Sequence, residues 1–146
     1  MKTIEEPIVI EQSFNLPAAE VWSAITVHER MIKWFFEDIP DFKAEVGFTT
    51  VFTVTCEDRV YPHRWKITEV IEHKLIRYDW RYDGYEGVAD VVFELIEGDG
   101  TTTCRVTHTM LSDSDNNIPE FQRPAGVEGW TYFIRNALKN YLASSA

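Results

Sequence analysis

The stretch Pro124–Leu142, with the sequence PAGVEGWTYFIRNALKNYL, decides the fold. Its apolar residues recur every three or four positions, which is the spacing of one face of a helix. These residues are Val127, Trp130, Phe133, Ile134, Ala137, Leu138, Tyr141 and Leu142. Pro124 suits a first helical turn, where its missing N–H would have no partner in any case. We therefore predict one long C-terminal helix, whose wide apolar stripe needs a sheet to cover it.

Upstream of this helix, apolar and polar residues alternate as they do in strands with one covered face. The predicted covered faces are Ile8, Ile10, Gln12 and Phe14; Phe48, Thr50, Phe52, Val54 and Cys56; Tyr61, His63, Trp65, Ile67 and Ile71; Ile76, Tyr78, Trp80 and Tyr82; Ala89, Val91, Phe93 and Leu95; and Thr102, Cys104, Val106, His108 and Met110. Two short helices, Ala18–Thr26 and Glu29–Trp34, are predicted after the first strand. The fold class is α+β, with a curved antiparallel sheet wrapped around the long C-terminal helix.

The length of 146 residues fits a single domain, which we place at residues 1–146. A net charge of −10 argues against nucleic acid and anionic membranes as partners, because like charges repel. The sequence lacks the apolar run of a signal peptide or a spanning helix. Cys56 and Cys104 form no disulfide framework or CxxC pair. We expect a cytoplasmic protein that uses no cofactor.

Three consecutive aromatic residues, Trp34, Phe35 and Phe36, end the second short helix. Consecutive side chains on a helix or a strand point in different directions, so the three cannot all face one core. We expect at least one of them to be partly exposed or to line a cavity. The alternative is that the trio wedges the helices against the sheet.

Many aromatic residues on the predicted covered faces carry a polar group. They are Tyr61, Trp65, Tyr78, Trp80 and Tyr82 on the strands and Trp130 on the helix. Their hydroxyl and indole N–H groups need hydrogen-bond partners when they are buried. A cavity that holds water or a ligand would supply these partners. The alternative is that the six are simply large core side chains.

His108 is predicted to face the same covered space. Burial disfavours its charged form, so the ring should be neutral and able both to donate and to accept a hydrogen bond. It either orients a ligand or is a core histidine bonded to the backbone or to a tyrosine. Cys104 precedes it by four residues, about 13 Å along a strand, which is too far to share a metal ion. An inward cysteine is usually inert, so we predict no metal site and no catalytic residue.

Two glycines, Gly126 and Gly129, lie in the first turns of the predicted C-terminal helix. Each destabilises a helix by roughly 0.5–1 kcal/mol relative to alanine. Some other interaction should offset this loss. Either the helix approaches a strand closely there, or the glycines form a pliable lid over a cavity.

Four short motifs occur within this order of elements: NLPAAEVWSA at residues 15–24, Lys33-Trp34-Phe35, Thr107-His108 and Gly129-Trp130. Together they resemble the Aha1-type branch of the START/Bet v 1-like (SRPBCC) superfamily, over nearly the whole chain. The resemblance implies a helix-grip fold with a deep apolar cavity between the sheet and the C-terminal helix. The branch is named for an activator of the Hsp90 ATPase that binds the chaperone through a separate domain. This chain has no room for such a domain, so we expect no chaperone partner.

We expect the protein to bind a small apolar or aromatic molecule in this cavity. The predicted ligand-binding residues are Trp34, Phe52, Trp65, Tyr78, Trp80, Tyr82, Phe93, His108, Trp130 and Ile134. One alternative is a cyclase- or hydrolase-like enzyme that uses the same cavity, with His108 as acid or base. Another is a chaperone-linked protein-interaction module. Apolar residues on the outer sheet face, Val88, Val92 and Ile96, indicate a covered patch or a homodimer contact.

Overall fold

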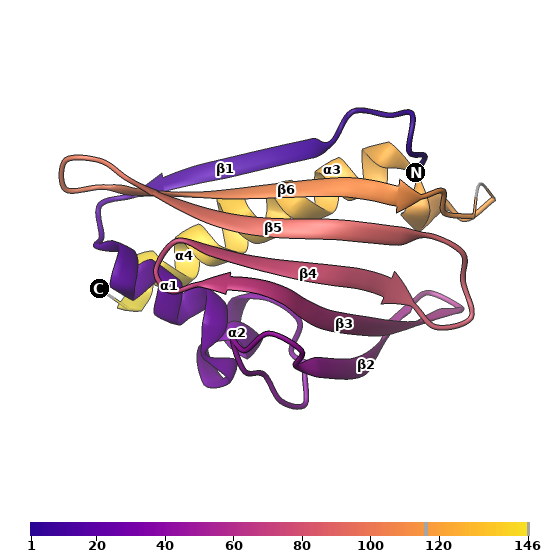
Figure 1. Ribbon diagram of the computed structural model, residues 1–146, viewed down its shortest axis with the longest axis horizontal. Coiled ribbons are helices and arrows are strands. Elements are labelled where there is room, and N and C mark those ends of the chain that lie inside the picture. Colours follow the sequence, from indigo (N-terminus) through magenta and orange to yellow (C-terminus); the bar gives the residue numbers. More distant parts are fainter. Residues whose placement is uncertain (116, 146) are drawn as a thin grey trace.

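The computed structural model describes residues 1–115 and 117–145, and these contain one antiparallel sheet of six strands in the order β1-β6-β5-β4-β3-β2 (Figure 1). The strands are β1 (Ile8–Phe14), β2 (Thr49–Cys56), β3 (Arg59–Ile71), β4 (Leu75–Tyr82), β5 (Val88–Glu97) and β6 (Thr102–Ser112). Two short helices, α1 (Ala18–Thr26) and α2 (His28–Trp34), follow β1. A 3-10 turn, η1 (Pro119–Phe121), precedes the C-terminal helix.

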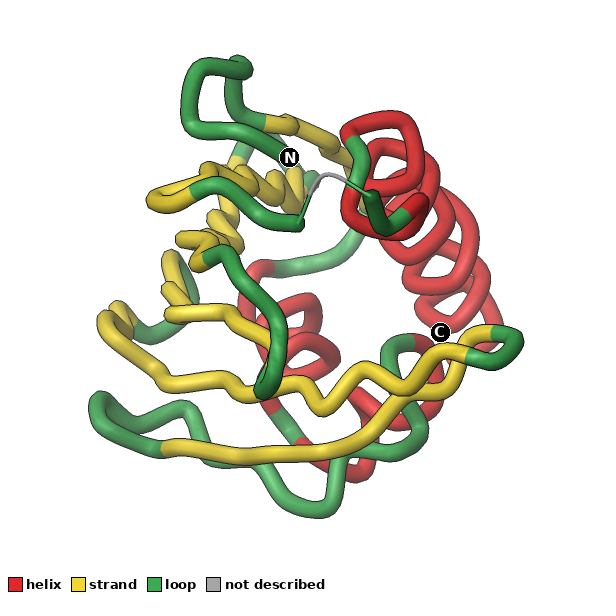
Figure 2. Tube along the Cα trace, turned by 90° about the vertical axis from the view of Figure 1, so that its right-hand side faces the viewer, coloured by secondary structure: helices red, strands yellow, loops and turns green. Residues whose placement is uncertain are grey.

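The sheet curves around the helices, which lie on its concave side (Figure 2). The C-terminal helix runs through three consecutive segments, α3 (Arg123–Thr131), η2 (Tyr132–Leu138) and α4 (Lys139–Ser145). Its buried side chains are Trp130, Ile134, Leu138 and Leu142. Full burial of such a side chain contributes about 1.5–3 kcal/mol, so this stripe is a major part of the core. The predicted α+β helix-grip fold is confirmed.

The middle of the C-terminal helix is wound differently from the prediction. The sequence predicts a uniform α-helix, whereas η2 is π-helical. The buried residues Trp130, Ile134, Leu138 and Leu142 are spaced four apart. Steps of four residues drift around an α-helix of 3.6 residues per turn, and the wider turns of a π-helix oppose that drift. The π segment therefore keeps all four side chains directed at the sheet.

Most of the predicted strand faces are confirmed, but the prediction for Ile71 at the end of β3 is wrong. Ile71 is 46% exposed. The pairing of β3 with β4 shifts register between Ile67 and Glu69. Such an irregularity reverses the alternation of the side chains beyond it. Val70 consequently packs against the core in place of Ile71.

The outer face of the sheet carries surface ion pairs. Arg64 binds Asp83 at 2.8 Å, and Arg105 on β6 binds Glu11 on β1 at 2.7 Å. Exposed pairs of this kind contribute little to stability. Of the apolar residues on this face, Val92 is buried within the single chain. A homodimer contact at this face stays a prediction.

Gly87, just before β5, is a position where we expect a large effect of substitution. Its φ is +109°, and an added Cβ would lie 2.8 Å from both Cα and Cβ of Ser114. We predict that Gly87→Ala lowers the free energy of unfolding by about 2–3 kcal/mol, because strain and steric overlap add. Urea unfolding followed by circular dichroism measures the change.

Gly84 provides the matched control for this substitution. Its φ is +85°, but an added Cβ would meet no atom within 4 Å. Gly84→Ala therefore isolates the backbone term, which we expect to cost about 1 kcal/mol. Equal losses in the two variants would show that the contact with Ser114 is unimportant.

Candidate ligand-binding site

A cavity of about 140 Å³ lies between the sheet and the first turns of α3. Its wall is largely aromatic and consists of Phe36, Trp80, Tyr82, Trp130 and Phe133. The remaining lining residues are His108, Glu120, Met1, Ala125, Gly126 and Gly129. A smaller space of about 30 Å³ shares part of this lining, including Trp80, Tyr82 and His108. A mainly apolar cavity with a few polar groups is typical of small-molecule sites.

Small residues on both sides create this space. Ala89 of β5 lines the smaller, adjoining space, where it pairs with Trp80 on one side and with Met110 on the other, and its methyl group fills little of the volume between them. A Cβ added at Gly129 would meet nothing within 4 Å, whereas one at Gly126 would lie 3.0 Å from Cδ1 of Ile8. The two glycines thus differ. Gly126 marks a close approach to β1, and Gly129 leaves free space on the cavity side of the helix.

The aromatic trio after α2 limits the size of the cavity. Trp34 and Phe35 are buried, with ring centroids 4.8 Å apart, and Phe35 lies 4.8 Å from Phe133 of the helix. Phe36 is half-buried and lines the cavity on one side. It also lines an open depression of about 650 Å³ beside the C-terminal helix. The expectation that at least one member of the trio lines a cavity is confirmed for Phe36, while the other two wedge the helices against the sheet.

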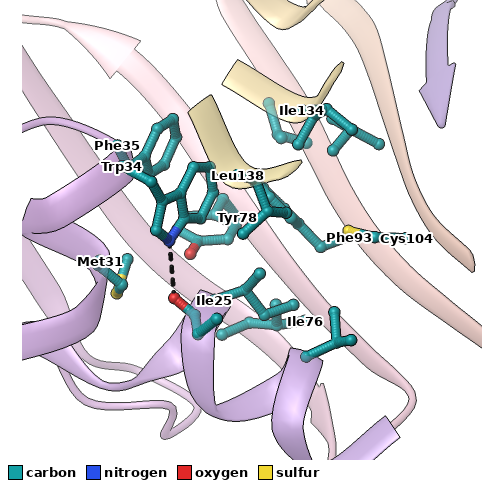
Figure 3. Packing of buried hydrophobic residues seen from close by; sticks show 14 of the residues in the cluster. Ile25, Met31, Trp34, Phe35, Ile76, Tyr78, Phe93, Cys104, Ile134 and Leu138 are labelled. Atoms are coloured by element: carbon teal, nitrogen blue, oxygen red, sulfur yellow. Dashed lines mark hydrogen bonds between the residues drawn. The ribbon is translucent and has the colours of Figure 1, made fainter. Parts of the chain in front are cut away.

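The predicted site residues fall into two groups in the structure. Those that line the cavity are Trp80, Tyr82, His108 and Trp130. Those that belong to the core and do not line this cavity are Trp34, Phe52, Trp65, Tyr78, Phe93 and Ile134, of which Trp34 also lines the open depression. Figure 3 shows part of this core, where the Trp34 indole donates to the carbonyl of Ala24 at 2.8 Å.

Seven lining residues are absent from the predicted set: Met1, Phe36, Glu120, Ala125, Gly126, Gly129 and Phe133. Phe36 belongs to the aromatic trio and Phe133 to the apolar stripe of the helix, so both carry a signal in the sequence. Glu120 lies in a polar loop that gives none. Arg59 Nε donates to its carboxylate at 2.8 Å, and this ion pair lowers the pKa of Glu120.

His108 is held by the helix that covers it. Trp130 Nε1 donates to His108 Nδ1 at 2.9 Å, and both side chains are buried. Burial lowers the pKa of His108 to about 4, so the ring is neutral at neutral pH. Nε2 of His108 is buried and has no hydrogen-bond partner among the described residues.

Tyr82 and Trp80 form a second polar pair on the wall. The Trp80 indole donates to the Tyr82 hydroxyl at 3.1 Å. Burial raises the pKa of Tyr82 to about 12, so the hydroxyl keeps its proton at neutral pH. Because the hydroxyl accepts from Trp80, its own hydrogen is left to donate to another group.

A second buried histidine, His63, lies behind the cavity wall. Its ring centroid is 5.0 Å from that of Phe36 and 4.6 Å from that of Tyr82. Nδ1 lies 3.0 Å from the carbonyl oxygen of Tyr61, to which it donates. Burial lowers the pKa of His63 to about 4, so this ring is also neutral at neutral pH.

The described residues contain no group of three or more His, Cys, Asp or Glu side chains that could hold a metal ion. Cys104 is buried, and burial raises its pKa to about 12. A thiol that stays protonated is a poor nucleophile. Within residues 1–115 and 117–145, no helix is both long and apolar enough to cross a membrane.

Comparison with known proteins supports the fold. The family model described as "Activator of Hsp90 ATPase homolog 1-like protein" matches residues 15–143. Among solved structures, MLL2253 from Mesorhizobium loti is 20% identical with a TM-score of 0.76, and the match covers 97% of this chain and 99% of that one. CalU16 from Micromonospora echinospora is 21% identical with a TM-score of 0.68, covering 93% of this chain and 73% of the other.

DynU16, a protein of the dynemicin biosynthetic locus, is 21% identical with a TM-score of 0.76. The match covers 97% of this chain but 48% of DynU16, so this chain spans about half the length of that protein. No curated protein sequence matches this chain. At these identities the solved structures establish a shared fold.

Proposed function

This chain belongs to the activator of Hsp90 ATPase homolog 1-like family of the START/Bet v 1-like (SRPBCC) superfamily, and we propose from this premise that it binds a small aromatic molecule. The site is the cavity between the sheet and α3, and residues 1–146 form a single domain around it. The observation that carries the proposal is the aromatic wall opposite the side-chain-free face of the helix at Gly129.

The volume of the cavity limits the size of the ligand. At about 140 Å³ it is close to the ~150 Å³ apolar cavity that accommodates benzene in another protein. The ligand in this conformation is therefore a single ring with a short substituent. A larger ligand would require Phe36 to move, because this half-buried side chain separates the cavity from the open depression.

The expected affinity is modest. Burial of apolar surface contributes about 25 cal/mol per Å², and small ligands reach at most about 1.5 kcal/mol per heavy atom. A ligand of one ring would then bind with a Kd on the order of 1 mM to 1 μM. Titrations should cover this range.

Filling the cavity tests the proposal. We predict that Gly129→Leu lowers the affinity for toluene at least tenfold, because the new side chain extends into the space that the ligand would occupy. Isothermal titration calorimetry and the shift of the melting temperature with toluene concentration both report binding.

Gly129→Ala is the control, since a Cβ at this position meets nothing. It should keep its affinity for toluene and gain about 0.5–1 kcal/mol in stability from its higher helix propensity. Undiminished binding by Gly129→Leu would place the ligand elsewhere.

A cyclase- or hydrolase-like enzyme is the second candidate, because His108 and Tyr82 bring proton donors to the same cavity. A general base, however, needs a free lone pair. Nδ1 of His108 accepts from Trp130, so in the neutral ring Nε2 carries the proton. This arrangement suits hydrogen bonding to a ligand better than proton abstraction, and it favours binding over catalysis.

A further inference from the structure

The unused hydrogen-bond donors of the cavity restrict what the ligand can be. His108 is 8% exposed, and its Nε2 has no partner among residues 1–115 and 117–145. Buried polar groups nearly always have partners, and an unmatched one destabilises the protein. A ligand that accepts a hydrogen bond would satisfy this nitrogen.

The contact with Trp130 determines which form of the histidine faces the ligand. An indole N–H can only donate, so Nδ1 of His108 must accept at 2.9 Å. The remaining nitrogen, Nε2, then carries the hydrogen. His108, one of the residues that line the cavity, therefore has a donor and no acceptor left for a partner.

Tyr82 on β4 also has a hydrogen-bond donor without a partner among the described residues. Its hydroxyl oxygen accepts from the Trp80 indole at 3.1 Å, which leaves its hydrogen to donate. The indoles of Trp130 and Trp80 thus orient the donors of two residues that line the same cavity, His108 and Tyr82.

The acidic side chain on this lining, Glu120, binds Arg59 through Oε1, whereas its Oε2 is buried and has no hydrogen-bond partner among the described residues. The opposite charges of Glu120 and of the Met1 amino group on this lining favour a neutral ligand.

We infer that the cavity selects an aromatic ring that carries a neutral oxygen acceptor, such as an aryl carbonyl, with His108 as the specificity-determining residue and Trp130 as its positioning residue. This inference rests on the proposed function and narrows its ligand class. It excludes plain hydrocarbons as preferred ligands.

Two probes of equal shape test the inference. Acetophenone and α-methylstyrene differ only in that a carbonyl oxygen replaces a methylene group. An apolar cavity without donors would prefer the hydrocarbon, because burying an unpaired carbonyl is unfavourable. We expect the wild-type protein to bind acetophenone more tightly than α-methylstyrene in calorimetric titrations.

Variants of His108 identify the donor. His108→Leu should shift the ratio of the two Kd values roughly tenfold toward the hydrocarbon, since the hydrogen bond is lost. His108→Gln should retain the preference for the ketone, because its amide can accept from Trp130 and still donate. Trp130→Phe should weaken the preference for the ketone, because without the indole N–H the hydrogen of His108 is no longer held on Nε2.

Nitrogen-15 NMR of labelled histidine reads the tautomer directly and does not depend on any variant folding. The signals assigned to His108 should show a protonated Nε2 and an unprotonated Nδ1, with Nε2 shifting when acetophenone is added, whereas His63 should show a protonated Nδ1 because it donates to the Tyr61 carbonyl. A protonated Nδ1 in His108, or tighter binding of α-methylstyrene by the wild type, would overturn the inference and leave the cavity as a binding site. Binding of neither probe would overturn the proposed function itself.

Discussion

Replacing Phe35 by alanine is expected to lower the free energy of unfolding by about 3–5 kcal/mol, the usual range for removing a buried phenylalanine. The ring is 8% exposed and lies among other aromatic rings of the core. Its centroid is 5.5 Å from that of Trp65 and 6.0 Å from that of Trp130. Aromatic pairs add to the burial term, so the loss should be near the upper end. Urea unfolding measures the loss.

The same variant should bind larger ligands. Phe35 lies beside Phe36, Trp130 and Phe133, which line the cavity, so its removal extends the cavity into the core. We expect Phe35→Ala to bind naphthalene at least tenfold more tightly than the wild type. Ligand binding should also restore part of the lost stability, because the ligand binds only the folded state.

Phe42→Ala is the matched control. Phe42 is 5% exposed and packs on Phe48, Trp65 and Tyr78 rather than on the cavity lining. It should lose comparable stability without gaining affinity for naphthalene. Equal naphthalene binding by the two variants would mean that Phe35 does not limit the cavity.

The fold is predictable from sequence because its two periodicities are clear. Alternation of period two continues through β4, where Ile76, Tyr78 and Trp80 are buried as predicted. Irregular backbone is harder to predict. The register shift at Ile67 and the π segment at Tyr132–Leu138 depend on how the elements meet in space, and no residue in either stretch indicates them.

The candidate site was predictable in its chemistry and less so in its position. Alternation correctly puts Trp65 and Trp80 on the same sheet face, and they form a cross-strand pair. It does not tell which part of that face stays open. That depends on where Phe35 and Phe36 pack against the helix, and their rings fill the space over Trp65. The cavity is left at Trp80, Tyr82 and His108.

The hydrogen bonds of the site could not be predicted from the sequence for the same reason, because they also depend on how distant segments pack. The sequence indicates that His108 is neutral and that Trp130 needs a partner for its N–H. Only the crossing of α3 over β6 pairs the two, at 2.9 Å. A local pattern thus supplies the donors and acceptors, and long-range packing decides which of them meet.

Acidification is the second perturbation with a large expected effect, because it acts on His63 and His108 together. Each has a pKa lowered from 6.5 to about 4 by burial. The unfolded chain therefore takes up protons near pH 6.5, and the folded protein does so only near pH 4. Stability must fall as the pH decreases between these values. The gap corresponds to about 3 kcal/mol for each histidine.

Between pH 6.5 and 4.5 the effect of the two histidines on stability can be measured apart from the effect of the carboxylates. Ion-paired acidic groups such as Asp83 and Glu120 have lowered pKa values, so their contribution is lost only at lower pH. We predict that the free energy of unfolding, measured in urea at each pH, declines steeply over this interval. His63→Gln and His108→Gln should each remove about half of the slope, and the double variant should be nearly flat. A flat profile in the wild type would mean that neither histidine is held neutral by burial, and would remove the neutral-donor role assigned to His108.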